Sequence, residues 1–395
     1  EVTDTNLTVN LQLTAEAIEL EGTTVRPGRH ELETLDASPG RMSLQVHQLK
    51  AAPAAIEADP MRTLQTLPGV AALSDYSVGL YVRGGTPDQT LVLLDGTEVY
   101  NASHLFGLFS TFPADAAKST ELLRGGYAAR YGDRLSSVLD VITDEGNKER
   151  FEAHGGIGLL ASRLTVQGPA LSGSYLLSGR RTHLEPVLAL AKDALDAKRL
   201  GYSFFDLQGK THQLLSDTDQ VYAAGYAGQD GLRYRFDEFG LDLEWGNRTA
   251  SAQWIRVLGS ELYGSLMLTG SRFHARTVFD SEDARFLETN RLDDVSVKAE
   301  VSYYPTAAHR VEAGAQLKQL AMAYRFGEAG QEYAHVDVKG TLPVLYVQDN
   351  WTLGQRLVVQ PGLRLSYLSS GGYAGADPRL AVRYQVAPGT FLKAA

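Results

Sequence analysis

The stretch from residue 64 to residue 143 constrains the fold more than any other part of the chain. Three short apolar strands in it each run into a glycine turn. Leu80–Val82 leads into Arg83-Gly84-Gly85, Leu91–Leu94 into Asp95-Gly96, and Glu121–Leu123 into Arg124-Gly125-Gly126. Glycine adopts positive φ without steric cost, so strands of this length can reverse tightly. The pattern predicts a small α/β domain of about 80 residues.

The order of the motifs in this stretch is more specific than any single motif. LPGV is followed by VRGG, LLDGTEV, ELLRGGYAARYG and SVLDVIT. This succession resembles the plug domain of TonB-dependent outer-membrane receptors, the transporters of Gram-negative bacteria. The resemblance implies a receptor of the cell outer membrane that binds a scarce extracellular solute and imports it into the periplasm with energy from TonB.

Composition excludes several other classes of protein. The formal net charge is −10, so no basic surface is available to neutralise a nucleic acid. The chain has no cysteine, which removes disulfide scaffolds and thiolate metal sites. No run of apolar residues is long enough for a membrane-spanning helix. There is no HExxH, GxSxG or GxxxxGK motif. We therefore predict no enzyme activity, no catalytic residues, no metal site and no cofactor.

From about residue 151 onward the chain alternates between apolar and polar residues, which predicts long antiparallel strands. Short connections alternate with longer segments, as in outer-membrane barrels. The longer segments are 184–202, 230–240, 279–293, 327–340 and 369–377. The predicted fold is therefore mixed: a small α/β plug followed by antiparallel transmembrane β-barrel strands. We count about 12 to 13 strands where plugged barrels have about 22, so the barrel is incomplete in this chain and both ends are expected to be cut.

Four regions follow from these patterns. Residues 1–14 alternate as a strand, either the last strand of a preceding β-sandwich or one that joins the plug. Residues 15–40 are a linker, 41–145 the plug and 146–395 the first part of the barrel. Helical signals lie in 41–67, where Leu44, His47 and Gln48 are spaced for a helix and Asp59-Pro60 can begin another. A further helix is expected within 184–195.

The resemblance also implies a TonB box, a short extended segment before the plug that pairs with a strand of TonB. The candidate residues are Leu20, Glu21, Gly22, Thr23, Thr24 and Val25. Strand addition uses main-chain hydrogen bonds, so the sequence requirement is loose and a plain linker is the alternative.

Charged and glycine residues of the plug are expected to form its motif and its contacts with the barrel. They are Arg83, Gly84, Gly85, Asp95, Gly96, Glu121, Arg124, Gly125, Tyr131 and Gly132. On the barrel, the expected partners are Glu300, Glu312, Lys318 and Arg364. Individually modest polar contacts suit a plug that must be displaced.

Ligand recognition in such receptors falls on the outward tips of the plug and on the outer loops. Aromatic, imidazole and amide side chains can stack on and hydrogen-bond a solute. The candidates are Tyr76, Tyr100, Asn101, His104 and Phe106, with burial in the plug core as the alternative. Besides TonB with its inner-membrane energising complex, the expected partners are outer-membrane lipid and the extracellular ligand, which is a small molecule, glycan or peptide. A surface lipoprotein is a further candidate.

Two other functions remain open at this point. The same architecture can act mainly in surface signalling or in handing a substrate to a partner. A soluble secreted β-rich binding protein would show the same alternation, because it too has one wet face.

Overall fold

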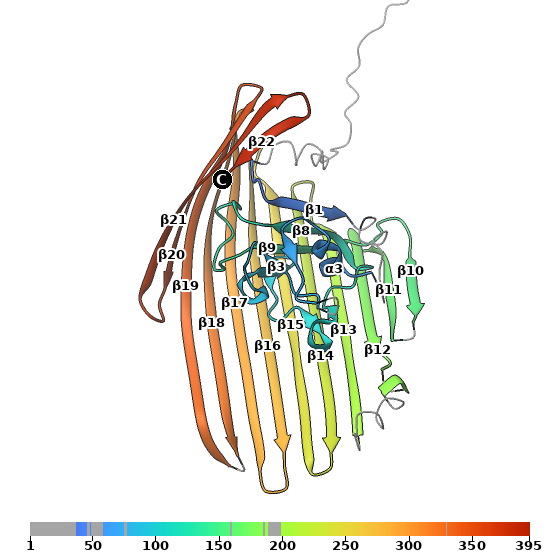
Figure 1. The fold of residues 1–395 in the computed structure, drawn as a ribbon. Coiled ribbons are helices and arrows are strands. Elements are labelled where there is room, and N and C mark those ends of the chain that lie inside the picture. Colours follow the sequence, from blue (N-terminus) through green and yellow to red (C-terminus); the bar gives the residue numbers. More distant parts are fainter. Residues whose placement is uncertain are drawn as a thin grey trace, which may run out of the picture. The chain divides into compact units, whose positions relative to one another are not determined.

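The computed structural model describes residues 37–45, 48, 58–74, 77–158, 160–184, 186–188, 199–328 and 330–395 (Figure 1). The predicted strand at 1–14 and the TonB-box segment lie outside these residues, and so does most of the predicted helix at 184–195. In the part of the chain that is described, no helix is long and apolar enough to cross a membrane.

The plug, as we call the described residues between 37 and 145, is built on a five-stranded sheet with the order β1-β8-β9-β4-β5. β4 and β9 pair in parallel, and the other neighbours are antiparallel. The sheet strands are β1 (Arg41–Gln45), β4 (Leu91–Leu94), β5 (Thr97–Glu98), β8 (Ala117–Leu123) and β9 (Val138–Thr143). The other elements are α3 (Pro60–Gln65), β2 (Val70–Ala71), β3 (Tyr81–Val82), η1 (Pro87–Gln89), β6 (Ser103–His104), η2 (Leu105–Gly107) and β7 (Phe109–Ser110).

The predicted helix start at Asp59-Pro60 is confirmed. The Asp59 side chain accepts hydrogen bonds from the backbone N–H groups of Met61 and Arg62 at 2.8 and 3.2 Å. These groups lack partners within the helix, so the cap stabilises it. The helical prediction was wrong at residues 41–45, which form β1 and pair with β8. Pairing at the sheet edge outweighs a helical spacing supported by few residues.

The plug core lies between α3 and the sheet. Leu64, Leu122 and Leu139 are fully buried there, and Leu80 is 1% exposed. Tyr226 belongs to the same buried cluster although it comes from a later strand. The second part of the chain therefore completes the packing of the first.

The second part is a 13-stranded antiparallel sheet, which we call the wall, with its strands in sequence order (Figure 1). This confirms the predicted strand-rich architecture. Its strands are β10 (Glu152–Ile157), β11 (Ala161–Ala170), β12 (Gly173–Thr182), β13 (Arg199–Leu214), β14 (Asp219–Phe236), β15 (Phe239–Val257), β16 (Leu262–Asp280), β17 (Arg285–Thr306), β18 (His309–Glu328), β19 (Gln331–Leu353), β20 (Leu357–Leu368), β21 (Tyr373–Ala387) and β22 (Thr390–Ala394).

Most of the predicted long connections are wrong. β14 continues to Phe236 and β15 begins at Phe239, so only two residues join them. The segments around 279–293 and 327–340 are likewise continuous strands with short turns. β12 ends at Thr182 and β13 begins at Arg199, and the segment between them is described only in part. The strand ends at these turns form what we call the far rim, and the plug lies toward the opposite rim (Figure 1).

Toward the far rim, apolar side chains lie on the inner face of the wall and charged side chains on the outer face. This change explains why these strands were predicted to be loops. In β17, Asp294 lies on the inner face, where it accepts a hydrogen bond from Tyr100 of the plug, and Val295 and Val297 are exposed on the outer face. Nearer the far rim, Phe286 has the parity of the inner face and Arg291 that of the outer face. A pattern search that expects apolar residues outside sees these segments as irregular.

Candidate functional site

The β4–β5 hairpin brings an acidic turn of the plug against the wall. Asp95 and Gly96 both have positive φ, at 47° and 75°, as a tight two-residue hairpin turn requires. Asp95 accepts hydrogen bonds from Lys210 Nζ at 2.7 Å and from the Thr143 hydroxyl. A Cβ on Gly96 would lie 2.6 Å from the Met267 methyl group. Glycine is needed at this turn for close approach as well as for its backbone conformation.

A second charged group joins the plug to the wall at β18. Lys318 Nζ lies 2.5 Å from Glu98 and 3.0 Å from Asp294. Tyr100 donates to Asp294 at 2.9 Å, and Arg134 also pairs with Glu98. Tyr100 is thus held by the wall in this structure.

The loop that follows β8 makes the third contact. Arg364 bonds to Asp133 at 2.9 Å and to the carbonyl oxygen of Arg130 at 3.2 Å, and its guanidinium crosses the face of Gly132. Ala129 N–H donates to Gln348 at 2.8 Å. Two of the four expected wall partners, Lys318 and Arg364, therefore contact the plug directly. Glu300 bonds to Lys298 and Tyr346, and Glu312 to Arg310.

Several predicted motif residues act within the plug. Arg41 pairs with Glu121 at 2.7 Å, and Arg124 donates to the carbonyl of Pro68. The Tyr131 hydroxyl donates to Asp140 at 3.2 Å. A Cβ on Gly125 would lie near the Arg83 guanidinium, and one on Gly85 would overlap Ser136, whereas Gly84 turns in open space.

A cavity of about 190 Å³ lies between the plug and strands β15–β18 and β20, and we call it the seam cavity. Plug groups such as Glu98 and Asp140 face wall groups such as Lys298, Lys318 and Arg364 across it. A space of this size holds about six water molecules. Burial, together with the neighbouring Glu121, raises the pKa of the Asp140 carboxyl to about 6.

A different contact forms on the side of β12–β14, around His104. The imidazole nitrogens lie 2.8 Å from Asp206 and 2.7 Å from Asp230. Arg180 donates to Asp206 at 2.7 Å and to the carbonyl oxygen of Ser110 at 2.6 Å. All four charged side chains are at most 4% exposed. We call these four residues the anchor cluster.

His104 is held as a cation. Two ionised carboxylates can both accept from the ring only when both ring nitrogens carry a proton. Burial by itself would lower the pKa of His104, but Asp206 and Asp230 outweigh it and raise the pKa to about 9. Both nitrogens are used, so His104 offers no ring hydrogen bond to a ligand in this conformation.

The loop that His104 begins is unusual. Leu105 and Phe106 have φ values of 47° and 54°, which side chains rarely adopt, and Gly107 follows at 101°. Tyr202 and Asp230 both accept from the Leu105 N–H, at 2.7 and 3.2 Å. These bonds hold a conformation that the chain alone would not favour.

The structure thus places the candidate ligand residues in different surroundings. Phe106 is 67% exposed, 5.3 Å between ring centroids from Trp245, and Asn101 is exposed with its carbonyl bonded to Asn247. Tyr100 and His104 are engaged by the wall. Tyr76 lies outside the described residues.

Beyond the plug, the inner face carries a run of aromatic rings that motif reasoning missed. Phe239 and Phe279 have centroids 4.7 Å apart, and Phe286 and Phe326 stack at 5.9 Å. On the described inner positions of β14–β18 between the plug and the far rim there is no lysine or arginine. The alternation would have predicted this lining if the apolar positions near the far rim had been assigned to the inner face.

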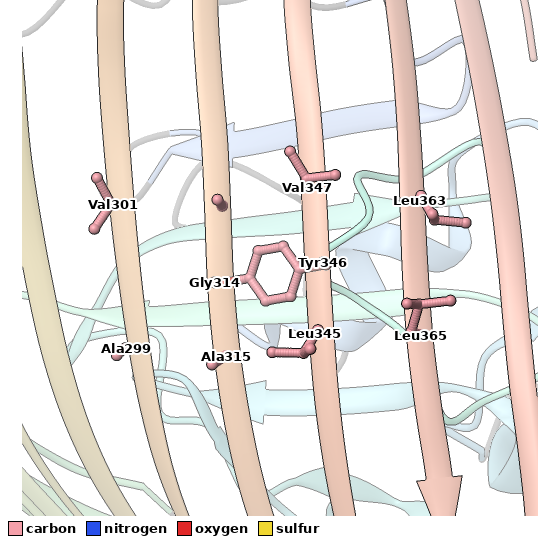
Figure 2. Close-up of a pocket in the computed structure, with 10 residues that line it drawn as sticks. Ala299, Val301, Gly314, Ala315, Leu345, Tyr346, Val347, Leu363 and Leu365 are labelled. Carbon is pink, nitrogen blue, oxygen red and sulfur yellow. The ribbon is translucent and has the colours of Figure 1, made fainter.

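The outer face has an apolar hollow of about 470 Å³. Figure 2 shows Val301, Leu345, Val347, Leu363 and Leu365 around Gly314. Gly314 lacks a side chain, and the ring of Tyr346 lies against it. In the described residues no cluster of His, Asp and Glu could hold a metal ion.

Comparison with known families agrees with this architecture. Residues 44–137 match the family model described as TonB-dependent Receptor Plug Domain, and residues 186–395 match TonB dependent receptor-like, beta-barrel. The second match covers more than half of the chain. The protein belongs to the TonB-dependent receptor family, whose members are outer-membrane β-barrel receptors of Gram-negative bacteria.

Among curated proteins, the chain is similar to the vitamin B12 transporter of Vibrio vulnificus (strain YJ016), with 34% identity over 183 residues, 43% of this chain and 29% of the relative. It is also similar to the ferrienterobactin receptor of Escherichia coli (strain K12), with 28% identity over 130 residues, 28% of this chain and 17% of the relative. These relatives are transporters and receptors, not enzymes. Each match spans less than a third of the relative.

Solved structures show the same fold. The ferric enterobactin receptor PfeA of Pseudomonas aeruginosa superimposes with a TM-score of 0.70 at 16% identity, covering 90% of this chain and 61% of that one. The siderophore receptor PirA of Acinetobacter baumannii gives a TM-score of 0.69 at 17% identity, covering 90% and 60%. The chain thus spans about three fifths of these receptors.

Proposed function

We propose that the protein is an outer-membrane receptor that binds a scarce extracellular solute and imports it into the periplasm with energy from TonB. The observation that carries this proposal is the contact between plug and wall. Charged plug groups face charged wall groups across the seam cavity, so water can replace those contacts when the plug moves. Such a plug can close a pore and still be displaced.

The outer face supports a position in the outer membrane. From Val295 to Tyr303, the outward side chains of β17 are apolar. At about 3.3 Å per residue they run for about 26 Å along the strand, which a strand tilt of about 35–45° projects to about 19–22 Å along the membrane normal, within the apolar band of about 25 Å of outer-membrane barrels. The polar outer face of the far rim then lies outside the cell. Lipid acyl chains cover the hollow of Figure 2.

The ligand site in this proposal comprises Asn101 and Phe106 at the plug tip together with Trp245 and the aromatic lining. Rings and aliphatic side chains bind a solute through its apolar face. Since the described inner positions of β14–β18 beyond the plug carry no lysine or arginine, this lining gives a strongly anionic complex no charge partner. We therefore expect a solute with a large apolar face and little negative charge.

Equilibrium binding tests this ligand class directly. Cyanocobalamin and ferric enterobactin represent the neutral and the anionic alternatives. The detergent-solubilised protein is expected to bind cyanocobalamin at least tenfold more tightly, which corresponds to about 1.4 kcal/mol. Tighter binding of ferric enterobactin would contradict the proposed class.

Energy coupling depends in this proposal on the segment Leu20–Val25, which adds as a strand to TonB. Proline cannot donate a ladder hydrogen bond, so Thr23→Pro and Val25→Pro should abolish energy-dependent uptake of the bound solute. Binding at the cell surface should be unchanged. Uptake that survives both substitutions would rule out this segment as the box.

A further inference from the structure

The plug touches the wall in two ways, and at the anchor cluster aromatic rings cover the charged groups. His104 stacks on Phe204 with 4.1 Å between ring centroids and 3° between the planes. Phe109 packs against the same ring at 5.5 Å, and both phenyl groups are at most 2% exposed. Separating the plug from the wall at this contact would expose the aromatic rings to water and leave the charged groups without their partners.

The charges of the anchor cluster also balance one another. Two cations and two carboxylates sum to zero, and the Tyr226 hydroxyl donates to Asp206 at 2.5 Å. Tyr202 donates to Asp230. Three wall strands, β12, β13 and β14, supply the groups that hold one short plug segment, 104–110.

The opposite contact has different physical properties. There the charged groups line the seam cavity, so water can solvate them as the plug and wall separate. The desolvation penalty that makes a buried ion pair hard to break is smaller where water already has access. Motion is therefore easier at the seam than at the anchor cluster.

We propose that the anchor cluster is a fixed attachment, which keeps the plug bound to β12–β14 while the plug moves away from β16–β20. His104 is the positioning residue of this attachment. The inference rests on the proposed transport function, because a plug that never moves needs no fixed side. It also places the path of the solute between the plug and the wall strands that line the seam cavity.

Cross-linking can test which side moves, because the chain has no cysteine of its own. At the anchor side, Asp115 pairs with Arg163 at 2.7 Å, and Arg163 lies opposite Arg180 in the strand register. Asp115→Cys with Arg163→Cys can be joined by a short thiol-reactive linker. At the seam side, a Cβ on Gly362 would lie 3.2 Å from that of Ala129, so Ala129→Cys with Gly362→Cys can form a disulfide.

Uptake of labelled cyanocobalamin is measured in whole cells for both pairs. The anchor cross-link should leave uptake within about twofold, and the seam disulfide should lower it at least tenfold until it is reduced. Loss of uptake in the cross-linked anchor pair, or full uptake with the seam disulfide formed, would overturn the proposal. If the unmodified protein takes up no cyanocobalamin, the fault lies in the proposed ligand.

A second experiment does not depend on the ligand. His104→Gln leaves the buried cluster with a net negative charge, and His104→Gln with Asp230→Asn restores neutrality. The single variant should admit vancomycin and lower its inhibitory concentration several-fold, and the double variant should recover most of the loss. His335→Gln, at an exposed histidine, is the control. Equal leakage in the single and double variants, or none in either, would show that charge at His104 does not hold the plug.

Discussion

The anchor cluster and the seam use the same side-chain types and differ in what lies beside the charged groups. At the anchor, two cations and two carboxylates are sealed by Phe109 and Phe204. At the seam, Lys318 and Arg364 meet plug carboxylates beside a cavity of about 190 Å³. The surroundings of a salt bridge in this protein therefore decide whether it resists separation of the plug from the wall.

The largest difference is expected when one cation is removed from each side. Arg180→Met leaves Asp206 buried with one charge partner fewer, which should cost about 3–5 kcal/mol of plug stability. Lys318→Met should cost about 1–3 kcal/mol, because cavity water can solvate Glu98 and Asp294. Denaturant dependence of plug proteolysis in detergent measures both. Equal losses would contradict the distinction between a contact sealed by aromatic rings and one that lines a cavity.

Packing gives the next largest effect. A side chain at Gly132 would overlap the Arg364 guanidinium, so Gly132→Val should destabilise the plug by about 1–3 kcal/mol. Gly270→Ala is a suitable control, since nothing lies within 4 Å of its added Cβ. The same proteolysis assay compares them. A near-neutral Gly132→Val would mean that the 126–134 loop already lies loosely on the wall.

The two sides should also respond to different pH ranges. The folded pKa of His104, about 9, exceeds its ordinary value of 6.5, so the folded state binds the proton more tightly. Its stabilising contribution is complete below pH 6.5 and is lost as pH rises through 9. The pKa of Asp140 is raised from 3.8 to about 6, so its contribution is complete below pH 3.8 and is lost as pH rises through 6.

Protease cleavage of the plug across the pH range measures both transitions. His104→Gln should remove the alkaline transition and leave the acidic one, and Asp140→Asn should do the reverse. Loss of both transitions in either variant would mean that the plug opens as a single unit.

The sequence predicted the architecture because it rests on local patterns. Glycine turns after short strands and Asp59 before Pro60 act over a few residues, and strand alternation repeats along the whole wall. The anchor cluster depends on contacts between residues far apart in sequence: Asp206 and Asp230 belong to strands whose alternation predicts only that they face inward. Nothing local says that they meet His104. The far-rim strands were missed for another reason, because their polarity is inverted there.

The smallest effect on stability is expected at the plug tip. Phe106 is 67% exposed, so Phe106→Ala should change the stability of the plug by no more than about 0.5 kcal/mol. Its ring nevertheless lies beside Trp245 at the entrance to the aromatic lining. Loss of one aromatic contact of about 1 kcal/mol should weaken cyanocobalamin binding about fivefold to tenfold. Leu73→Ala, another exposed apolar side chain of the plug at 74%, is the matched control and should leave binding unchanged. If both substitutions weaken binding equally, exposed apolar surface in general binds the solute. If only Phe106→Ala does, the strained loop that the anchor cluster holds presents the ligand contact, and the fixed side of the plug is also the side that detects the solute.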